Sequence, residues 1–117
     1  MSNVYDLAHK LKRAIMNSDE YKNYKEKKKI VYSNEGNKKI VEDYRRQVLE
    51  LQMKQLSEQK IEEEELEKIR NLEEILRHNP SINEFLIAEY RFSQLIQDIS
   101  KIIGEAIDID LGMGKQL

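Results

Sequence analysis

The sequence predicts an all-α protein, an elongated antiparallel bundle of four to five helices with long central and C-terminal helices. Proline occurs once and glycine four times in 117 residues, so few residues are available for the tight turns that connect strands. Threonine is absent, and no run alternates apolar and polar residues as a half-buried strand would. Apolar residues recur instead at spacings of three and four, and a charged fraction of 36% is typical of long solvated helices.

The first predicted helix runs from about Asn3, which can cap it, to about Asn17. Its apolar row is Val4, Leu7, Leu11 and Ile15, at spacings of three and four. This pattern indicates a short amphipathic helix with one face turned toward other helices.

The second predicted helix follows Ser18, a good N-cap residue. Tyr21, Tyr24 and Val31 lie near one face, and most of the remaining surface is lysine. We expect this helix to end in the turn formed by residues 33–36.

The middle of the chain, residues 37–78, has two readings. In the first, one helix runs from about Asn37 to Glu58 and another begins near Ile61, where four consecutive glutamates suit the positive end of a helix dipole. In the second, a single helix continues from Asn37 to His78, because residues 57–62 contain neither glycine nor proline. The sequence leaves both open.

The last predicted helix, Ser81–Ile107, is long and amphipathic. Ser81 and Glu84 have the spacing of a capping box, and Pro80 separates the helix from what precedes it. Its apolar residues repeat as in a helix–helix seam, so we expect them to form the bundle core and the seam of a homodimer. The candidates are Ile82, Phe85, Leu86, Phe92, Leu95, Ile96, Ile99, Ile102 and Ile103.

Domain organisation follows from length and from the end of this pattern. Residues 1–107 are expected to form a single helical-bundle domain, since 117 residues suffice for one domain. Residues 108–117 lose the period and contain two glycines, so we expect a flexible C-terminal tail.

Metal and cofactor sites find little support in the sequence. The chain has no cysteine, so it cannot hold an iron–sulfur cluster or cysteine-bound zinc, and it has only two histidines. The acidic run Glu62–Glu65 lacks the alternating ligands and glycine turn of a calcium loop. We therefore expect no cofactor and no metal, and the absence of a nucleophile motif or a phosphate-binding loop argues against an enzyme.

One basic stretch supports an alternative function, RNA binding. Its lysines could follow phosphates, and neighbouring tyrosines could stack on bases. Against this, Tyr21 and Tyr24 share the helix face that should meet the core, and a net charge of −2 predicts no nucleic-acid partner. The candidate RNA-facing residues are Lys22, Lys25, Lys27, Lys28 and Lys29. Tyr90 lies off the main apolar seam and is the candidate for a protein-partner face.

Three stretches carry a resemblance to a known family: Asn79–Phe92, Ser18–Lys25, and Tyr44 with Gln47 and Gln55. On these stretches the chain resembles the YlbF/YmcA family of helical regulators of Gram-positive bacteria. The stretch Asn79–Phe92, continued by the apolar row of the last helix, is similar to the family's C-terminal helix. Ser18–Lys25 after the short first helix, and Tyr44 with nearby glutamines in the central helix, are similar as well. The resemblance covers roughly Val4–Ile107.

The resemblance implies a small cytoplasmic all-helical protein, often a dimer. The sequence itself has no apolar run long enough to suggest a membrane span. Some members act with a YaaT-type partner in competence, sporulation and biofilm formation and are linked to RNase Y and mRNA processing. Certain members carry iron–sulfur clusters on cysteines, a property that cannot transfer to a chain without cysteine. The YheA-type branch is an equally good match. The leading hypothesis is thus a cytoplasmic homodimeric regulator or adaptor with a YaaT-type or RNase Y-type partner, and a purely structural helical protein is a further alternative.

Overall fold

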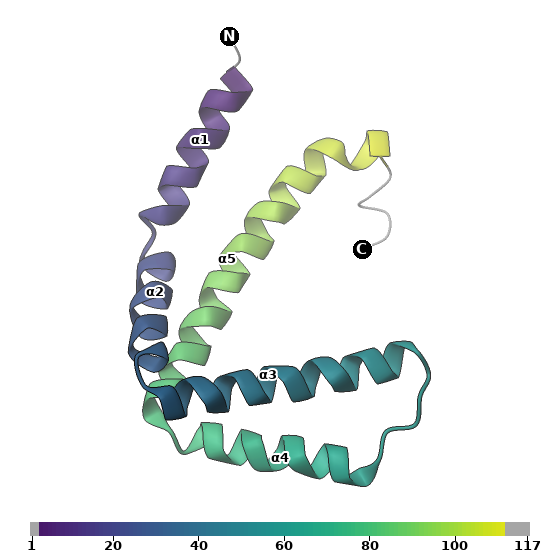
Figure 1. The fold of residues 1–117 in the computed structure, drawn as a ribbon. Coiled ribbons are helices and arrows are strands. Elements are labelled where there is room, and N and C mark those ends of the chain that lie inside the picture. Colours follow the sequence, from purple (N-terminus) through teal and green to yellow (C-terminus); the bar gives the residue numbers. More distant parts are fainter. Residues whose placement is uncertain (1–2, 112–117) are drawn as a thin grey trace. The chain divides into compact units, whose positions relative to one another are not determined.

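The structure, a computed structural model, describes residues 3–111, and their side chains as far as Ile107. In that range it contains five α-helices and no strand, which confirms the predicted all-α class with long central and C-terminal helices (Figure 1). The helices are α1 Asn3–Met16, α2 Asp19–Tyr32, α3 Glu35–Leu56, α4 Glu63–Arg77 and α5 Pro80–Leu111.

The chain divides into two compact units by its internal contacts. One comprises the residues up to Tyr24 together with those from Ile87 onward, and the other is Lys25–Leu86. Helices α2 and α5 contribute residues to both. The prediction of a single domain over residues 1–107 is not tested by this division.

The junctions around α2 are fixed by side-chain caps. Ser18 Oγ accepts a hydrogen bond from the Tyr21 amide at 3.1 Å, as predicted for the start of α2. At the other end Asn34 Oδ1 accepts from the Asn37 amide at 2.9 Å, which caps α3. Helix α3 consequently begins at Glu35, slightly before the predicted start at Asn37.

The chain breaks between α3 and α4, so the single continuous helix over residues 37–78 is wrong. Ser57 ends α3, and Glu58 adopts a left-handed conformation with φ 57°. The Glu58 amide donates to the Gln55 carbonyl at 3.3 Å, and the Gln59 amide donates to the Lys54 carbonyl at 2.9 Å. These two bonds form a Schellman motif, which stops a helix without needing proline.

Replacing Glu58 with glycine is expected to stabilise the protein by about 1 kcal/mol. A side chain at a left-handed position costs roughly 1–2 kcal/mol, which glycine avoids, although its flexible unfolded chain offsets part of the gain. Urea denaturation measures the change. Glu58→Ala is the matched control, since it removes the carboxylate but keeps the strain; equal stabilisation by both would contradict the backbone explanation.

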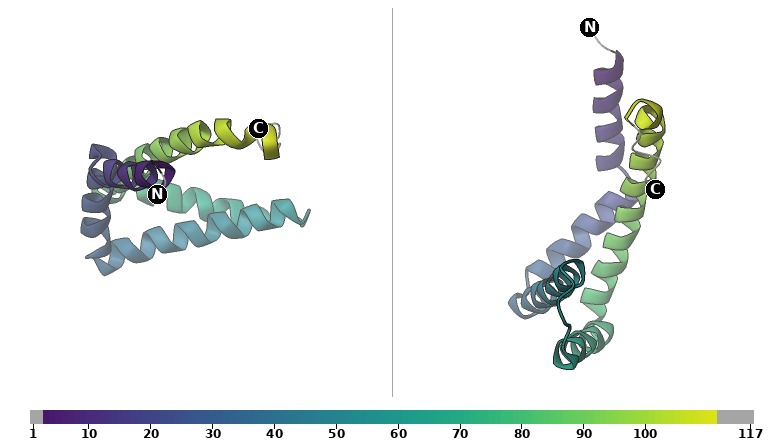
Figure 2. Two further views of the ribbon diagram at one scale, coloured as in Figure 1. Left: turned by 90° about the horizontal axis from the view of Figure 1, so that it is seen from above. Right: turned by 90° about the vertical axis from the view of Figure 1, so that its right-hand side faces the viewer.

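Helices α3 and α4 form an antiparallel hairpin with one register along its length. Asn79 Nδ2, just beyond α4, donates to Asn37 Oδ1 at 2.9 Å near the start of α3. In the middle the Tyr44 hydroxyl donates to Glu73 at 3.4 Å, and at the far end Lys54 pairs with Glu65 at 2.6 Å. Burial, together with the Glu73 carboxylate, raises the pKa of Tyr44. Both views in Figure 2 show the two helices side by side.

Glu65 is the carboxylate that fastens the far end of this hairpin. It accepts from Lys54 and, at 3.2 Å, from the Glu62 amide at the start of α4. These bonds hold the pKa of Glu65 below its ordinary value, the lysine being the larger cause. The acidic first turn predicted for this helix is confirmed, with residues 63–65 in it.

Glutamine at Glu65 is expected to destabilise the protein at neutral pH but not in acid. A carboxyl whose folded pKa is lowered contributes stability above its unfolded pKa, and this contribution is lost as the pH falls through the folded pKa. Urea midpoints of wild type and Glu65→Gln should therefore differ at pH 7 and converge as the pH falls through the lowered pKa of Glu65. Glu64→Gln, in the same helical turn, is the control; a Glu65→Gln effect independent of pH would contradict the ion-pair account.

Helix α5 begins at Pro80, one residue before the predicted start at Ser81. Asn79 Oδ1 accepts from the Ile82 amide at 3.2 Å, so Asn79 is the N-cap and Pro80 takes the first helical position. The expected Ser81–Glu84 capping box is wrong, because Glu84 instead pairs with Lys27 of α2 at 3.0 Å. At the other end α5 continues to Leu111, past the predicted end at Ile107; of the predicted tail 108–117, residues 112–117 lie outside the described residues.

The core of unit Lys25–Leu86 is small and gathers where α2, α3, α4 and α5 meet. Its fully buried side chains are Val31, Val41, Ile82 and Phe85, and Ile69 and Leu76 of α4 are also buried. The Phe85 ring meets the Tyr32 ring edge-on at 6.0 Å between centroids, and the Arg45 guanidinium lies 5.5 Å from the Phe85 centroid. Phe85 is therefore the residue around which this unit is packed.

Candidate interaction surface

The apolar row of α5 is covered at its start and progressively uncovered along its length. Ile82 and Phe85 are fully buried, while the next seam candidates are half-buried. Ile102 and Ile103 are 64% and 51% exposed, and Ile107 is also exposed. The half-buried candidates are Leu86, Phe92, Leu95, Ile96 and Ile99. One periodic row thus serves the core at one end and leaves isoleucines in contact with solvent at the other.

Phe92 of this row packs against two tyrosines near the start of α2. Its ring lies 5.3 Å from that of Tyr21 and 5.2 Å from that of Tyr24, the second pair nearly parallel. Both tyrosines are half-buried. Their rings are used for packing between α2 and α5, as the helix face on which they lie had suggested.

Helix α1 is the least covered element. It has no buried residue, and the apolar row along it becomes more exposed toward its N-terminus. Leu11 and Ile15 are half-buried, whereas Leu7 and Val4 are 61% and 73% exposed. Sequence reasoning recognised this row but did not single it out as a site, although its unbroken spacing was the available signal.

We call the five exposed aliphatic residues of α1 and of the last part of α5 the end face. Helices α1 and α5 run in opposite directions, so the N-terminal end of α1 and the C-terminal end of α5 lie on the same side of their unit (Figure 1). Figure 1 and the left view of Figure 2 show these ends standing apart. The end face comprises Val4, Leu7, Ile102, Ile103 and Ile107.

Two further apolar groups lie outside the end face. Tyr90 is 65% exposed and accepts a bond from Gln94 Nε2 at 3.5 Å, with exposed Ile87 one turn before it. Because Tyr90 and Phe92 are two residues apart, about 200° around the helix, they face nearly opposite sides of α5. On α3, Leu49, Met53 and Leu56 are exposed and recur at spacings of four and three, so they form a second apolar stripe.

The five lysines of the candidate RNA face are in unequal environments. Lys27 bonds Glu84, which raises its pKa, and Lys28 lies 5.6 Å from the Tyr32 ring centroid. The side chains of Lys22, Lys25, Lys28 and Lys29 are exposed. With Tyr21 and Tyr24 turned to Phe92, those two tyrosines are not presented beside the lysines as stacking partners.

Three acidic residues of α4, Glu63, Glu67 and Glu74, form ion pairs with neighbours in or directly after the same helix. Arg70 bonds Glu63 and Glu67 at 2.8 and 2.9 Å, and Glu74 bonds both Arg77 and His78. The pKa of Glu74 is lowered, chiefly by the His78 bond. Among the side chains described, those of residues 3–107, no three histidine, aspartate or glutamate residues converge as they would around a metal ion.

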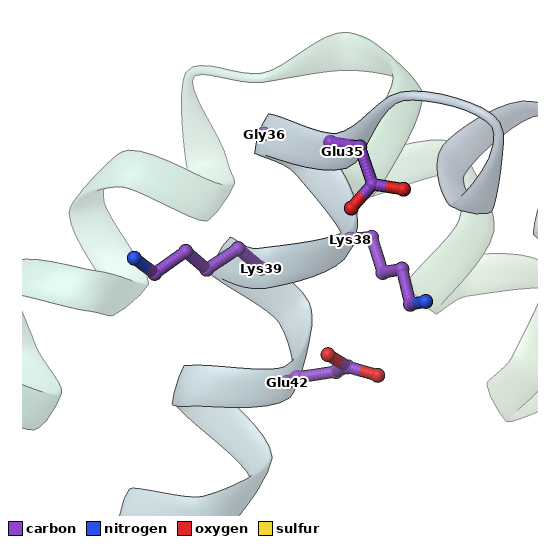
Figure 3. A pocket seen from close by; sticks show the side chains of 5 residues that line it. All are labelled: Glu35, Gly36, Lys38, Lys39 and Glu42. Atoms are coloured by element: carbon purple, nitrogen blue, oxygen red, sulfur yellow. The ribbon is translucent and has the colours of Figure 1, made fainter.

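A shallow hollow of about 410 Å³ lies at the start of α3 (Figure 3). Its side chains point in different directions rather than toward a common centre, and its two lysines and two glutamates cancel in charge. The lining residues are Glu35, Gly36, Lys38, Lys39 and Glu42. No convergent set of polar groups is formed, so the hollow does not indicate a ligand site. Within the part of the chain that the structure covers, none of the helices is both long and apolar enough to cross a bilayer.

Known proteins similar to this chain match it over nearly its whole length. The family described as "Control of competence regulator ComK, YlbF/YmcA" matches residues 4–108. A UPF0342 protein of Halothermothrix orenii is 44% identical, with 92% of each chain covered. A UPF0342 protein of Alkalihalophilus pseudofirmus is 41% identical over 92% of each chain. A solved structure, a "Protein of Unknown Function (DUF964) from Bacillus stearothermophilus", shares the fold with a TM-score of 0.76, 19% identity, and coverage of 96% of this chain and 99% of that one.

Proposed function

We propose that this protein, which belongs to the YlbF/YmcA family, is a non-enzymatic cytoplasmic regulator or adaptor that acts through helix-mediated protein contacts. The observation that carries the proposal is the distribution of apolar surface. Large aliphatic and aromatic side chains lie exposed in rows on α1, α3 and α5, while the hollow on α3 gathers no convergent polar groups. Exposed apolar rows of this kind are typical of surfaces that bind other proteins.

The partner we propose is a protein of the YaaT or RNase Y type, bound at the face formed by Ile87 and Tyr90. Tyrosine is enriched at binding hot spots because its ring buries a large apolar area while its hydroxyl keeps a hydrogen bond. Tyr90 has this combination, with an exposed ring and a bonded hydroxyl. The roles that we propose are those of the family, in the control of competence, sporulation and biofilm formation.

Affinity capture of the tagged full-length protein from its native cells, with and without RNase, tests this function. We expect mass spectrometry to find an RNase Y-type or YaaT-type protein in both samples. The double substitution Ile87→Ala with Tyr90→Ala should abolish its recovery, and Leu49→Ala, on the exposed face of α3, should not.

Two outcomes would contradict the proposal. If the partners disappear after RNase treatment, the contact runs through RNA, and the exposed lysines of α2 become the site to test by Lys→Glu substitution. If the protein recovers only itself, it does not act as an adaptor in those cells, and the structural reading is favoured.

A further inference from the structure

Leu49, Met53 and Leu56, which we call the α3 stripe, lie on the side of α3 that faces away from α4. Leu49 follows Tyr44 by five residues, about 140° around the helix, and Tyr44 bonds Glu73 of α4. Met53 and Leu56 continue from Leu49 at spacings of four and three, so they share its side of the helix. The three side chains are 56%, 60% and 86% exposed, so α4 leaves the α3 stripe uncovered.

The packing of the α3–α4 hairpin does not require this row of apolar side chains. The hairpin is held on the other side of α3, where the Tyr44–Glu73 bond and the Lys54–Glu65 pair join it to α4. Polar residues at the positions of the α3 stripe would keep the helix and remove a large apolar surface from water. Apolar residues at i, i+4 and i+7 are the anchors through which one helix binds another. The α3 stripe therefore has the pattern of a docking site for a helix.

Positive charge adjoins the α3 stripe on the same side of the helix. Arg45 and Arg46 precede Leu49 by four and three residues, within about 60° of it around the helix, and both are exposed. Arg46 pairs with Asp43 at 3.0 Å, but its side chain stays 59% exposed, and exposed pairs of this kind contribute little. The two lysines and two glutamates of the hollow before them cancel, so the two arginines leave this side of α3 with a net charge of +2.

The area of the α3 stripe suits a single helix better than a second copy of the chain. At on the order of 100 Å² for each side chain, the three residues offer roughly 300 Å² of apolar surface. Each partner in a standard protein–protein interface contributes about 800 Å², more than twice as much. Met53 occupies the middle of the stripe, and its flexible side chain can adapt to the shape of a partner.

We propose that the α3 stripe docks an amphipathic helix of another protein, one that carries acidic residues beside its apolar row. The partner helix lies along α3, with its apolar side chains on the stripe and its carboxylates next to Arg45 and Arg46. This surface belongs to the unit Lys25–Leu86 and shares no residue with the face formed by Ile87 and Tyr90. It is therefore a second docking site, independent of the proposed function.

Selection from a phage-displayed library of helical peptides on the full-length protein tests this site. Peptides of about 20 residues span about 30 Å, close to the length of α3. We expect the enriched sequences to share apolar residues at spacings of three and four and to carry more acidic than basic residues beside them. Their recovery should fall at least tenfold on Met53→Ser and on Leu56→Ser, and should be unchanged on Ile30→Ser, a half-exposed residue of α2 in the same unit.

Three outcomes of this selection would overturn the inference. They are a library that yields no binder, binders without an acidic excess, and binders recovered equally well on wild type and on both stripe variants. Helical circular dichroism of each variant verifies that a loss of binding does not come from unfolding.

Fluorescence anisotropy with a synthetic copy of the most enriched peptide tests the charge complementarity. Arg46→Glu should weaken binding at least fivefold in low salt, and this difference should shrink in about 0.5 M NaCl, where charges are screened. Arg77→Glu is the matched control, since Arg77 also holds an exposed i,i+3 ion pair, but on α4. Equal affinities of wild type and Arg46→Glu in low salt would overturn the inference.

Two further measurements separate this site from self-association and from the proposed function. Met53→Ser should leave the mass measured by sedimentation unchanged; a lower mass would place a second copy on the α3 stripe and overturn the inference. The Ile87→Ala, Tyr90→Ala variant should still bind the selected peptides, and Met53→Ser should still recover the partner that binds at Tyr90. Either proposal can therefore fail without the other.

Discussion

Phe85→Ala is expected to lower the free energy of unfolding by about 3–5 kcal/mol. Phe85 is completely buried between Tyr32 and Arg45, so truncation removes apolar contacts and leaves a cavity that the surrounding helices can fill only in part. A domain of this size has a total stability of about 5–15 kcal/mol, so the variant should be partly unfolded under mild conditions.

Urea denaturation followed by circular dichroism measures this change. The matched control is Tyr90→Ala, an exposed aromatic residue of the same helix, which should change stability by less than about 0.5 kcal/mol. A loss below about 1 kcal/mol for Phe85→Ala would mean that Phe85 is not central to the packing of its unit.

Asn79→Ala is expected to lower the free energy of unfolding by about 1–2 kcal/mol, while Ser81→Ala should leave it nearly unchanged. Asn79 caps α5 through the Ile82 amide and also bonds Asn37 at the start of α3, so one substitution removes two bonds. Comparing the unfolding free energies of these two variants shows whether Asn79 or Ser81 caps α5. A larger loss for Ser81→Ala than for Asn79→Ala would restore the capping box suggested by the sequence.

The cap of α5 shows why local signals mispredicted a helix start. Ser81 and Glu84 have the right spacing, but Pro80 is favoured at the first helical position and moves the cap back to Asn79. Glu84 is then free to pair with Lys27, which is 57 residues away in the sequence. Such a long-range partner leaves no trace in the local pattern, whereas the purely local cap at Ser18 was predicted correctly.

The break after α3 could be located only approximately for a different reason. Neither glycine nor proline stands there, and the stop depends on Glu58 in a left-handed conformation that glutamate rarely adopts. The charge pattern predicted a helix start near Ile61, close to the observed start of α4 at Glu63, because glutamates prefer the first turn of a helix. The placement of glutamates therefore indicated a new helix start, which the absence of glycine and proline did not.

The sequence predicted which residues of α5 share one apolar face, but it did not predict which of them are buried and which are exposed. Phe85, Phe92, Ile99 and Ile103 belong to one periodic row, yet their exposure ranges from none to about half. Periodicity reports which residues share a side of a helix, and not what packs on that side. The stripe of Leu49, Met53 and Leu56 is exposed, although its spacing of four and three is the same as that of a packed row.

Affinity capture of the wild type beside the Ile87→Ala, Tyr90→Ala variant tests most directly whether the protein acts through an exposed apolar helix face. We expect the wild type to retain a protein partner after RNase treatment and the variant to lose it, with helical circular dichroism equal in both. Equal recovery of that partner by the wild type and the variant would contradict the account, because the contact would then not use this face.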